Sequence, residues 1–532
     1  MKTLLDRPAP TAAAALTLRR GAVRVLFDNW TGTSTVPSRT LYPHQWSWDS
    51  AFIAIGLRHL SVRRAQQELE SLLAGQWADG RIPHILFNPA LPHDAYFPSP
   101  DFWQSSHAGR AAGAPTAPES SGIVQPPVHG LAAWLVHRAD AGASRRRGFL
   151  ARVYPRLAAW HDYLLTRRDL GGGGLAAVVH PWEPGMDNSP CWDRPLQRVA
   201  PAPPDAFHRA DLDHGHPADR PTDLDYGRYV RLATDYREAG YDDRATRHGF
   251  AVEDPCFNAL LIVSELALAA MARDLGAAAE PHTARAEELT RRLVGRLWDD
   301  DAGLFRVRDL GSDTLVDERS VSGLIPLVVP HLPTGIVGRL RETLDGPHFT
   351  APATRLVPSY DLTGHAFAPT RYWRGPAWFN TAWLIHRGLS THGHHEEAER
   401  LRQGFLAEAG RSEFAEYVDP TTGAARGTRH FSWTAALTLD LLSGEHLPGG
   451  EDLPRAEGLL GAEGLLGAEA LPPAGDLRPT AEALPPASDP PPAGNLPPAT
   501  EALPPAGDLR LAAEDLPPAG APLRAYPEET TR

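Results

Sequence analysis

One pattern recurs along the chain and limits its fold more than any other feature. A segment rich in aromatic and polar residues leads into an apolar helix, and a more polar helix follows. Residues 41–60 (LYPHQWSWDSAFIAIGLRHL) begin as a loop and continue as a helix that Asp49 or Ser50 can cap. An amphipathic helix is predicted at 61–78. A helix that is apolar all round is buried, whereas one with a polar face lies outside it.

About twelve helices are predicted in this way, most of them in consecutive pairs. The further helical segments are 23–29, 121–137, 148–167, 226–239, 255–274, 281–297, 320–329, 334–343, 374–389, 394–409 and 431–442. A short strand is predicted at 304–307, and 170–225 reads as a long loop. Six helical pairs can close into a ring. We therefore expect an all-α fold, an (α/α)6 toroid, whose long loops before the inner helices meet at one mouth.

The composition divides the 532 residues into three parts. Residues 1–20 are expected to be a flexible leader, and 21–447 a single helical domain. From 448 to 532 the chain consists of near-repeats rich in Pro and Ala, with one aromatic residue, Tyr526. Such a segment cannot bury enough apolar area to offset its ordering entropy, so it is predicted to be a disordered tail. A repeat scaffold is the alternative, but the unit is too short and too rich in proline to stack.

Charge and cysteine content exclude several classes of protein. The net charge is −13 and no basic patch is present, which argues against nucleic acid as a partner. No signal peptide or membrane-spanning segment is recognised, so no membrane association is expected. Cys191 and Cys256 are the only cysteines, too few for a disulfide framework or a zinc cluster. These features favour a cytoplasmic protein; the oligomeric state stays open, a homo-oligomer included.

The stretch Trp182–Asp193 (WEPGMDNSPCWD) carries the strongest chemical signal. Three carboxylates and an amide lie between or beside two tryptophans, and its prolines and Gly185 make it an irregular loop. Tryptophan stacks on the apolar face of a sugar ring while carboxyl groups act on it. A polar turn with incidental tryptophans is the alternative for this stretch taken alone.

Four other clusters have the same character and precede helices. They are Tyr42, Gln45, Trp46, Trp48 and Asp49; Gln125 within SGIVQPP; Tyr372–Asn380 (YWRGPAWFN); and Glu416–Pro420 (EYVDP) with Phe431–Thr434 (FSWT). Asp49 as a plain helix cap is the alternative for the first cluster. Five such loops together favour a ring of aromatics and carboxylates around one cavity.

In order and spacing, these five motifs resemble glycoside hydrolase family 63, in particular its small bacterial members that hydrolyse glucosylglycerate and mannosylglycerate. The resemblance extends from about residue 28 to 442. It implies the (α/α)6 toroid and an α-glycosidase that inverts the anomeric configuration and needs neither cofactor nor metal. The small-molecule substrate it implies is 2-O-α-glucosylglycerate, with mannosylglycerate second.

The resemblance also implies roles for individual residues. Asp187 would be the general acid and Glu416 the general base. Trp182, Trp192, Glu183 and Asp193 are the expected sources of a raised pKa at Asp187. Residues expected to hold the sugar are Trp46, Trp48, Asp49, Gln125, Trp182, Trp373 and Trp378.

The glycerate end of the substrate requires a cation. Arg220 and Tyr226, in RPTDLDY, resemble the family's carboxylate-binding stretch, and Tyr42 and Tyr372 are expected to close over the same end. A surface arginine is the alternative for Arg220. Residues 426–430 (RGTRH) depart from the more glycine-rich turn expected there.

Two rival functions follow from the same residues. One is an α-glucosidase or trehalase-like enzyme for a neutral disaccharide, which would not need Arg220. The other is a carbohydrate-binding or scaffolding protein without activity, against which the intact Asp187 and Glu416 argue. The sequence does not choose between glucose and mannose, which differ by the placement of one hydroxyl.

Overall fold

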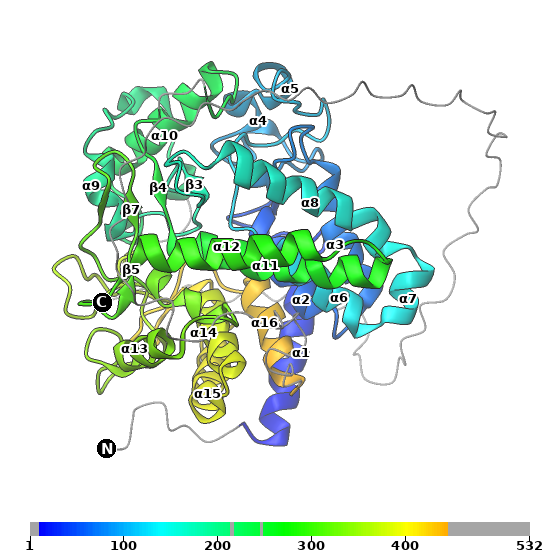
Figure 1. Ribbon diagram of the computed structural model, residues 1–532, viewed down its shortest axis with the longest axis vertical. Helices are drawn as coiled ribbons and strands as arrows, with labels where there is room; N and C mark the ends of the chain where they lie inside the picture. The colour runs from blue at the N-terminus through cyan, green and yellow to red at the C-terminus, as the bar shows by residue number, and fades with distance from the viewer. Residues whose placement is uncertain (1–9, 213–216, 245–247, 445–532) are drawn as a thin grey trace, which may run out of the picture. The chain divides into compact units, whose positions relative to one another are not determined.

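The computed structural model describes residues 10–212, 217–244 and 248–444, and these are predominantly helical (Figure 1). The tail predicted at 448–532 lies outside the described residues, as do residues 1–9. The flexible leader predicted at 1–20 is wrong from residue 12 onward. Helix α1 begins there because Thr11 accepts a hydrogen bond from the Ala14 amide and caps it.

The helices differ in how much of their surface is buried. Five are buried over most of their circumference: α2 (Ser47–Leu57), α6 (His129–Ala139), α11 (Pro255–Leu275), α14 (Phe379–Thr391) and α16 (Ser432–Leu442). Seven long helices keep an exposed face: α1 (Ala12–Asp28), α3 (Val62–Ala74), α8 (Phe149–Arg167), α10 (Asp223–Glu238), α12 (Glu280–Leu297), α13 (Thr334–Asp345) and α15 (His395–Arg411). The short helices are α4 (Pro100–Trp103), α5 (Ser105–Ala108), α7 (Ala141–Arg146) and α9 (Asp193–Leu196).

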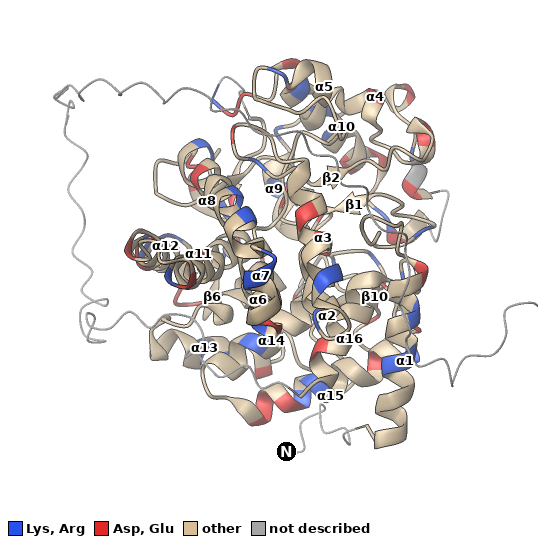
Figure 2. Ribbon diagram, turned by 90° about the vertical axis from the view of Figure 1, so that its right-hand side faces the viewer, with Lys and Arg blue, Asp and Glu red and all other residues tan. Residues whose placement is uncertain are grey.

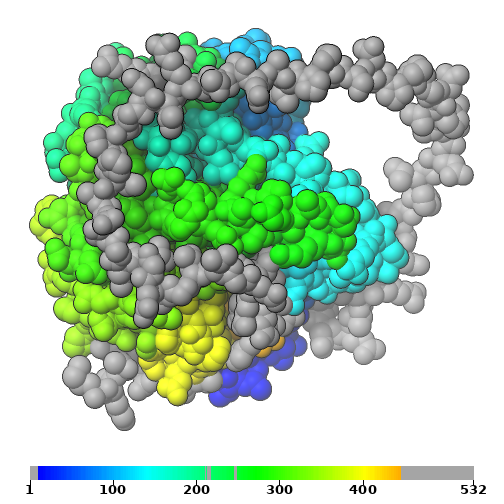
Figure 3. Space-filling model, viewed as in Figure 1, coloured from blue at the N-terminus to red at the C-terminus, as the bar shows by residue number. Residues whose placement is uncertain are grey.

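The buried helices pack against one another in a closed cycle. Helix α2 contacts α6, α6 contacts α11, α11 contacts the 3-10 segment η7 (Ile325–Val328), η7 contacts α14, α14 contacts α16, and α16 contacts α2. The exposed helices cover this cycle from outside: α3 on α2, α8 and α12 on α11, α15 on α14 and α1 on α16. Figure 3 shows α12 in green at the surface, and Figure 2 shows charges of both signs on α15.

The pair α11 and α12 illustrates the sequence rule. Helix α11 is buried from Pro255 to Ala272, and Asp254 caps it by accepting a hydrogen bond from the Phe257 amide. By length and composition α11 is apolar enough to cross a membrane, yet its most apolar window is entirely buried within the protein. Helix α12 buries a single stripe: His282, Ala286, Leu289, Leu293 and Leu297.

Two local predictions are corrected. Helix α2 begins at Ser47, so Asp49 lies in its first turn and is not the cap. The segment 320–329 is not a regular helix but two 3-10 turns, η6 (Val321–Gly323) and η7. Pro326 lies inside this segment and cannot donate a helical hydrogen bond.

The strands in the described residues are two residues long and pair antiparallel. They are β1 (Gln45–Trp46), β2 (Ile85–Leu86), β3 (Ala177–Val178), β4 (Val252–Glu253), β5 (Trp298–Asp299), β6 (Leu304–Phe305), β7 (Arg308–Asp309), β8 (Thr314–Leu315), β9 (Ala377–Trp378), β10 (Tyr417–Val418) and β11 (Ala425–Arg426). Their orders are β1-β2, β11-β10-β9, β3-β4-β7-β8 and β5-β6. Strands β1 and β9 lead directly into α2 and α14, which fixes the direction in which each chain segment enters its helix.

The close approach of α2 to α16 supplies a test of the packing. A Cβ on Gly56 of α2 would lie 2.3 Å from the Ala436 carbonyl oxygen of α16. We expect Gly56→Ala to destabilise the protein by about 1–3 kcal/mol, because backbone cannot yield as a side chain does. Gly295→Ala in α12, where the new methyl group meets nothing within 4 Å, should be neutral or stabilise by up to about 1 kcal/mol. Equal melting temperatures for the two variants would contradict the α2–α16 contact.

Candidate active site

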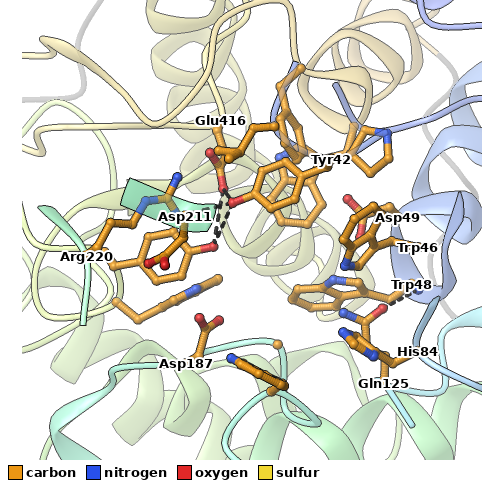
Figure 4. Close-up of a pocket in the computed structure, with 18 of the residues that line it drawn as sticks. Tyr42, Trp46, Trp48, Asp49, His84, Gln125, Asp187, Asp211, Arg220 and Glu416 are labelled. Carbon is orange, nitrogen blue, oxygen red and sulfur yellow. Dashed lines mark hydrogen bonds between the residues drawn. The ribbon is translucent and has the colours of Figure 1, made fainter. Parts of the chain in front are cut away.

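The thirteen side chains that the sequence assigns to catalysis or substrate binding all line one pocket (Figure 4). They are Tyr42, Trp46, Trp48, Asp49, Gln125, Trp182, Asp187, Arg220, Tyr226, Tyr372, Trp373, Trp378 and Glu416. Most belong to the segments that lead into the buried helices. The helical cycle therefore gathers stretches that lie far apart in the sequence.

Glu416 is held from both of its carboxylate oxygens. Oε1 accepts hydrogen bonds from the hydroxyls of Tyr42 (3.0 Å) and Tyr372 (3.4 Å), and Oε2 accepts one from the Thr428 amide (3.2 Å). Burial raises the pKa of Glu416, while the Arg220 charge and these three donors act in the opposite direction. The side chain thus has a fixed orientation and several partners that favour its ionised form.

Asp187 has a different environment, although it lines the same pocket. Burial raises its pKa to about 7, and the negative charges of Glu416 and Asp211 add to the effect. Its own backbone amide and Arg220 lower the pKa by less. Figure 4 shows Asp187 and Glu416 entering the cavity from opposite sides. The pocket therefore combines a carboxyl group that keeps its proton near neutral pH with a hydrogen-bonded carboxylate.

Two acidic residues of the central motif, predicted to raise the pKa of Asp187, are not among the main causes of its shift. Glu183 forms a fully buried ion pair with Arg168 (2.8 Å), and Asp193 pairs with Arg374 (2.6 Å). Each carboxylate is thereby neutralised by its own arginine. Glu183 also accepts a hydrogen bond from the Val179 amide (2.6 Å), so it organises the loop that carries Asp187.

The two tryptophans of the motif also differ in position. Trp182 lines the pocket, whereas Trp192 is 1% exposed, lies in the hydrophobic core and donates a hydrogen bond to the Met186 carbonyl (2.7 Å). Trp192 therefore stabilises the loop from the core and does not line the pocket. Gly185 (φ +68°) brings the loop against Trp48, since a Cβ there would lie 2.4 Å from the Trp48 ring.

Arg220 is a buried side chain, not the surface arginine of the alternative interpretation. It is 7% exposed, it donates to the Tyr42 hydroxyl (3.2 Å), and its guanidinium lies 4.9 Å from the centre of the Tyr372 ring. Within the described residues no carboxylate forms an ion pair with it. A buried guanidinium of this kind can accept an anionic ligand.

Tyr226 lies one turn into α10, which begins at Asp223 and not at the predicted residue 226, and it is buried in the same pocket. The helix starts with a capping box made by Thr222 and Asp225. The Tyr226 hydroxyl donates to the Phe97 carbonyl (3.4 Å), and the Arg209 guanidinium lies 4.3 Å from the ring centre.

The remaining aromatic residues form a stacked wall. The Trp373 and Trp378 rings are 4.0 Å apart and nearly parallel, and Trp378 stacks on Tyr417 at 4.4 Å. On another side, the Gln125 carbonyl oxygen accepts a hydrogen bond from the Trp48 amide (3.1 Å). Extended apolar faces with polar groups at their edges suit a sugar ring.

Several pocket residues were not selected from the sequence. They are Pro37, Leu41, His84, Tyr96, Pro98, Gly185, Asp211, Pro221, Phe431 and Trp433. His84 belongs to none of the five sequence clusters. It reaches the site through the pairing of β2 with β1, and its carbonyl accepts a hydrogen bond from the Ser47 amide (2.9 Å). Phe431 and Trp433 belong to the fifth cluster, so their sequence signal existed.

Within the described residues no group of three or more His, Cys, Asp and Glu side chains has the arrangement of a metal site. The acidic and basic side chains that line the pocket are three aspartates (Asp49, Asp187 and Asp211), Glu416, Arg220 and His84. This set can transfer protons and bind an anion.

Comparison with known proteins gives a consistent result. The model of the mannosylglycerate hydrolase MGH1-like glycoside hydrolase domain matches residues 42–434. A mannosylglycerate hydrolase of Rubrobacter radiotolerans is 40% identical over 79% of this chain and 96% of its own length. A glucosylglycerate hydrolase of Mycolicibacterium hassiacum is 38% identical over 82% of this chain and 98% of its own.

A solved structure matches over the same region. The mannosylglycerate hydrolase of Thermus thermophilus, a family 63 enzyme in complex with Tris and D-glycerate, is 37% identical and covers 80% of this chain and 99% of its own. The TM-score is 0.73. The chain belongs to the mannosylglycerate hydrolase-like glycoside hydrolases of family 63.

Proposed function

We propose that this protein hydrolyses a 2-O-α-glycoside of glycerate, releasing hexose and glycerate. Glucosylglycerate and mannosylglycerate are the two candidate substrates. The buried Arg220 guanidinium carries the proposal, because it lines the pocket and has no carboxylate partner among the described residues. A glycerate carboxylate would supply the missing charge. The D-glycerate complex of the Thermus relative supports this assignment.

In the proposed reaction Asp187 and Glu416 have opposite roles. Asp187 donates its proton to the glycosidic oxygen as the bond from that oxygen to the anomeric carbon breaks. Glu416 accepts a proton from the water that attacks the anomeric carbon from the other face, so the hexose leaves with inverted configuration. The raised pKa of Asp187 and the three donors around Glu416 support this division.

We further propose that the closed cycle of packed elements is an (α/α)6 toroid. In this arrangement the 3-10 segments η6 and η7 replace one inner helix between α11 and α14. The pocket then lies at the mouth where the loops before the inner helices meet. A cytoplasmic location is a further part of the proposal and rests on the sequence alone.

The proposed pair can be tested by isosteric substitution. Asp187→Asn and Glu416→Gln should each lower kcat by about a hundredfold or more, since each removes a proton-transfer group. Glu413→Gln, at an exposed position three residues before the base, is the matched control and should turn over normally. Activity near the wild-type level in either pocket variant, with an unchanged melting temperature, would remove that residue from the mechanism. NMR of the first-formed hexose should show the inverted anomer.

The pH dependence follows from the same groups. The active form has Asp187 protonated and Glu416 ionised. Because the pKa of Asp187 is about 7, kcat/KM should fall as the pH rises through about 7. On the acid side it should fall as Glu416 gains a proton, at a pH above the ordinary glutamate value of 4.5. A rate that stays level from pH 6 to 9 would contradict Asp187 as the acid.

Substitution of Arg220 tests whether the aglycone of the substrate is charged or neutral. Loss of one charge-assisted contact corresponds to about 1.5–3 kcal/mol, so Arg220→Ala should raise KM for glucosylglycerate roughly ten- to a hundredfold. A neutral glycoside such as glucosylglycerol should be much less affected, and Arg220→Lys should recover only part of the loss. Arg231→Ala, at a half-exposed position on α10, is the control. Equal losses on both substrates would favour a neutral disaccharide.

A further inference from the structure

Next to Arg220 in the sequence, an aspartate is paired with a second arginine. Asp219 directly precedes Arg220 and is 6% exposed. Its Oδ2 lies 3.3 Å from Nη1 of Arg426, whose side chain is 24% exposed. Neither Asp219 nor Arg426 lines the pocket.

Arg426 belongs to the hairpin that also positions the proposed base. It lies in β11 opposite Tyr417 of β10, and Glu416 precedes Tyr417. The next two residues of this turn lie against Glu416: a Cβ on Gly427 would lie 2.2 Å from Oε2, and the Thr428 amide donates to the same atom. The turn 426–430, which departs from the expected glycine-rich sequence, therefore contacts both Asp219 and the proposed base Glu416.

Four charged side chains interact electrostatically with the buried Tyr417. Burial raises the pKa of Tyr417; Arg220 and Arg426 lower it, and Glu416 and Asp219 raise it. All four groups therefore lie within electrostatic range of one hydroxyl. This hydroxyl has no hydrogen-bond partner among the described residues.

The arrangement affects the charge available to a ligand. A carboxylate beside Arg220 with no other partner would attract its guanidinium and repel an incoming anion. Pairing with Arg426 neutralises Asp219, so Asp219 does not compete with a substrate carboxylate for Arg220. We propose that Arg426 is a positioning residue that pairs with Asp219 and thereby keeps Arg220 available for the carboxylate of the substrate.

This inference rests on the proposed function, because it assumes that Arg220 binds an anionic aglycone. If the inference holds, the Asp219 carboxylate weakens binding of the anionic substrate when Arg426 is absent. The inference therefore predicts that removing both charges is less damaging than removing the arginine alone. A residue that only supported the fold, or one that bound the substrate directly, would not show this rescue.

The test compares Arg426→Gln, Asp219→Asn and the double variant in the full-length protein. The substrates are 2-O-α-glucosylglycerate and 2-O-α-glucosylglycerol, which differ in whether the aglycone carries a carboxylate. Arg426→Gln should raise KM for the glycerate by about tenfold and change KM for the glycerol by less than about threefold. The double variant should return to within about threefold of the wild-type KM for the glycerate.

Two further variants complete the design. Arg429→Gln removes the same charge from an exposed ion pair with Glu413 (2.9 Å) in the same hairpin, and should leave both KM values unchanged. Arg426→Lys retains a charge for the single 3.3 Å contact and should remain close to the wild type, which tests the inference if Arg426→Gln folds poorly.

Three outcomes would overturn the inference: no rescue in the double variant, equal losses on both substrates in Arg426→Gln, or a tenfold loss in Arg426→Lys. Failure of the proposed function is distinct, because it would appear as an equal effect of Arg220→Ala on the two substrates. If Arg220→Ala discriminates between them and Arg426→Gln does not, only the role of Arg426 fails.

Discussion

The contact between α2 and α16 is the constraint on which the pocket depends. These helices lie near the two ends of the described chain, and their packing closes the cycle of buried elements. Gly56 permits the approach, because any side chain there would meet the backbone of Ala436. The same closure brings Tyr42 beside Phe431, with ring centres 5.9 Å apart. Without it the first and last motifs would not share a cavity.

Within the pocket, burial and hydrogen bonding separate two carboxyl groups that have similar chemistry. Burial raises the pKa of both, because the charged form loses hydration. Glu416 accepts from two tyrosine hydroxyls and an amide, whereas the hydrogen bond that favours ionised Asp187 comes from its own backbone. The number of donors at each oxygen therefore suits one group to hold a proton and the other to accept one.

Arginines determine which acidic residues remain available for chemistry. Arg168 and Arg374 neutralise Glu183 and Asp193, and these pairs hold the loop around Asp187. Arg220, by contrast, lines the pocket, and its close partners among the described residues are tyrosines. The charges of this site thus fall into pairs that support the fold and single groups that face the cavity.

The sequence by itself determined the helical class, the pairing of apolar with amphipathic helices, and thirteen of the side chains that line the pocket. These were accessible because periodicity and motif composition are local properties of the chain. It did not show that Glu183 and Asp193 each pair with an arginine, because those arginines, Arg168 and Arg374, lie outside the motif. Nor did it find His84, which one strand pairing brings to the site, or the pairing of Asp219 with Arg426 across 207 residues. Only the tertiary structure decided these points, because burial and the partner of each charge depend on segments distant in the chain.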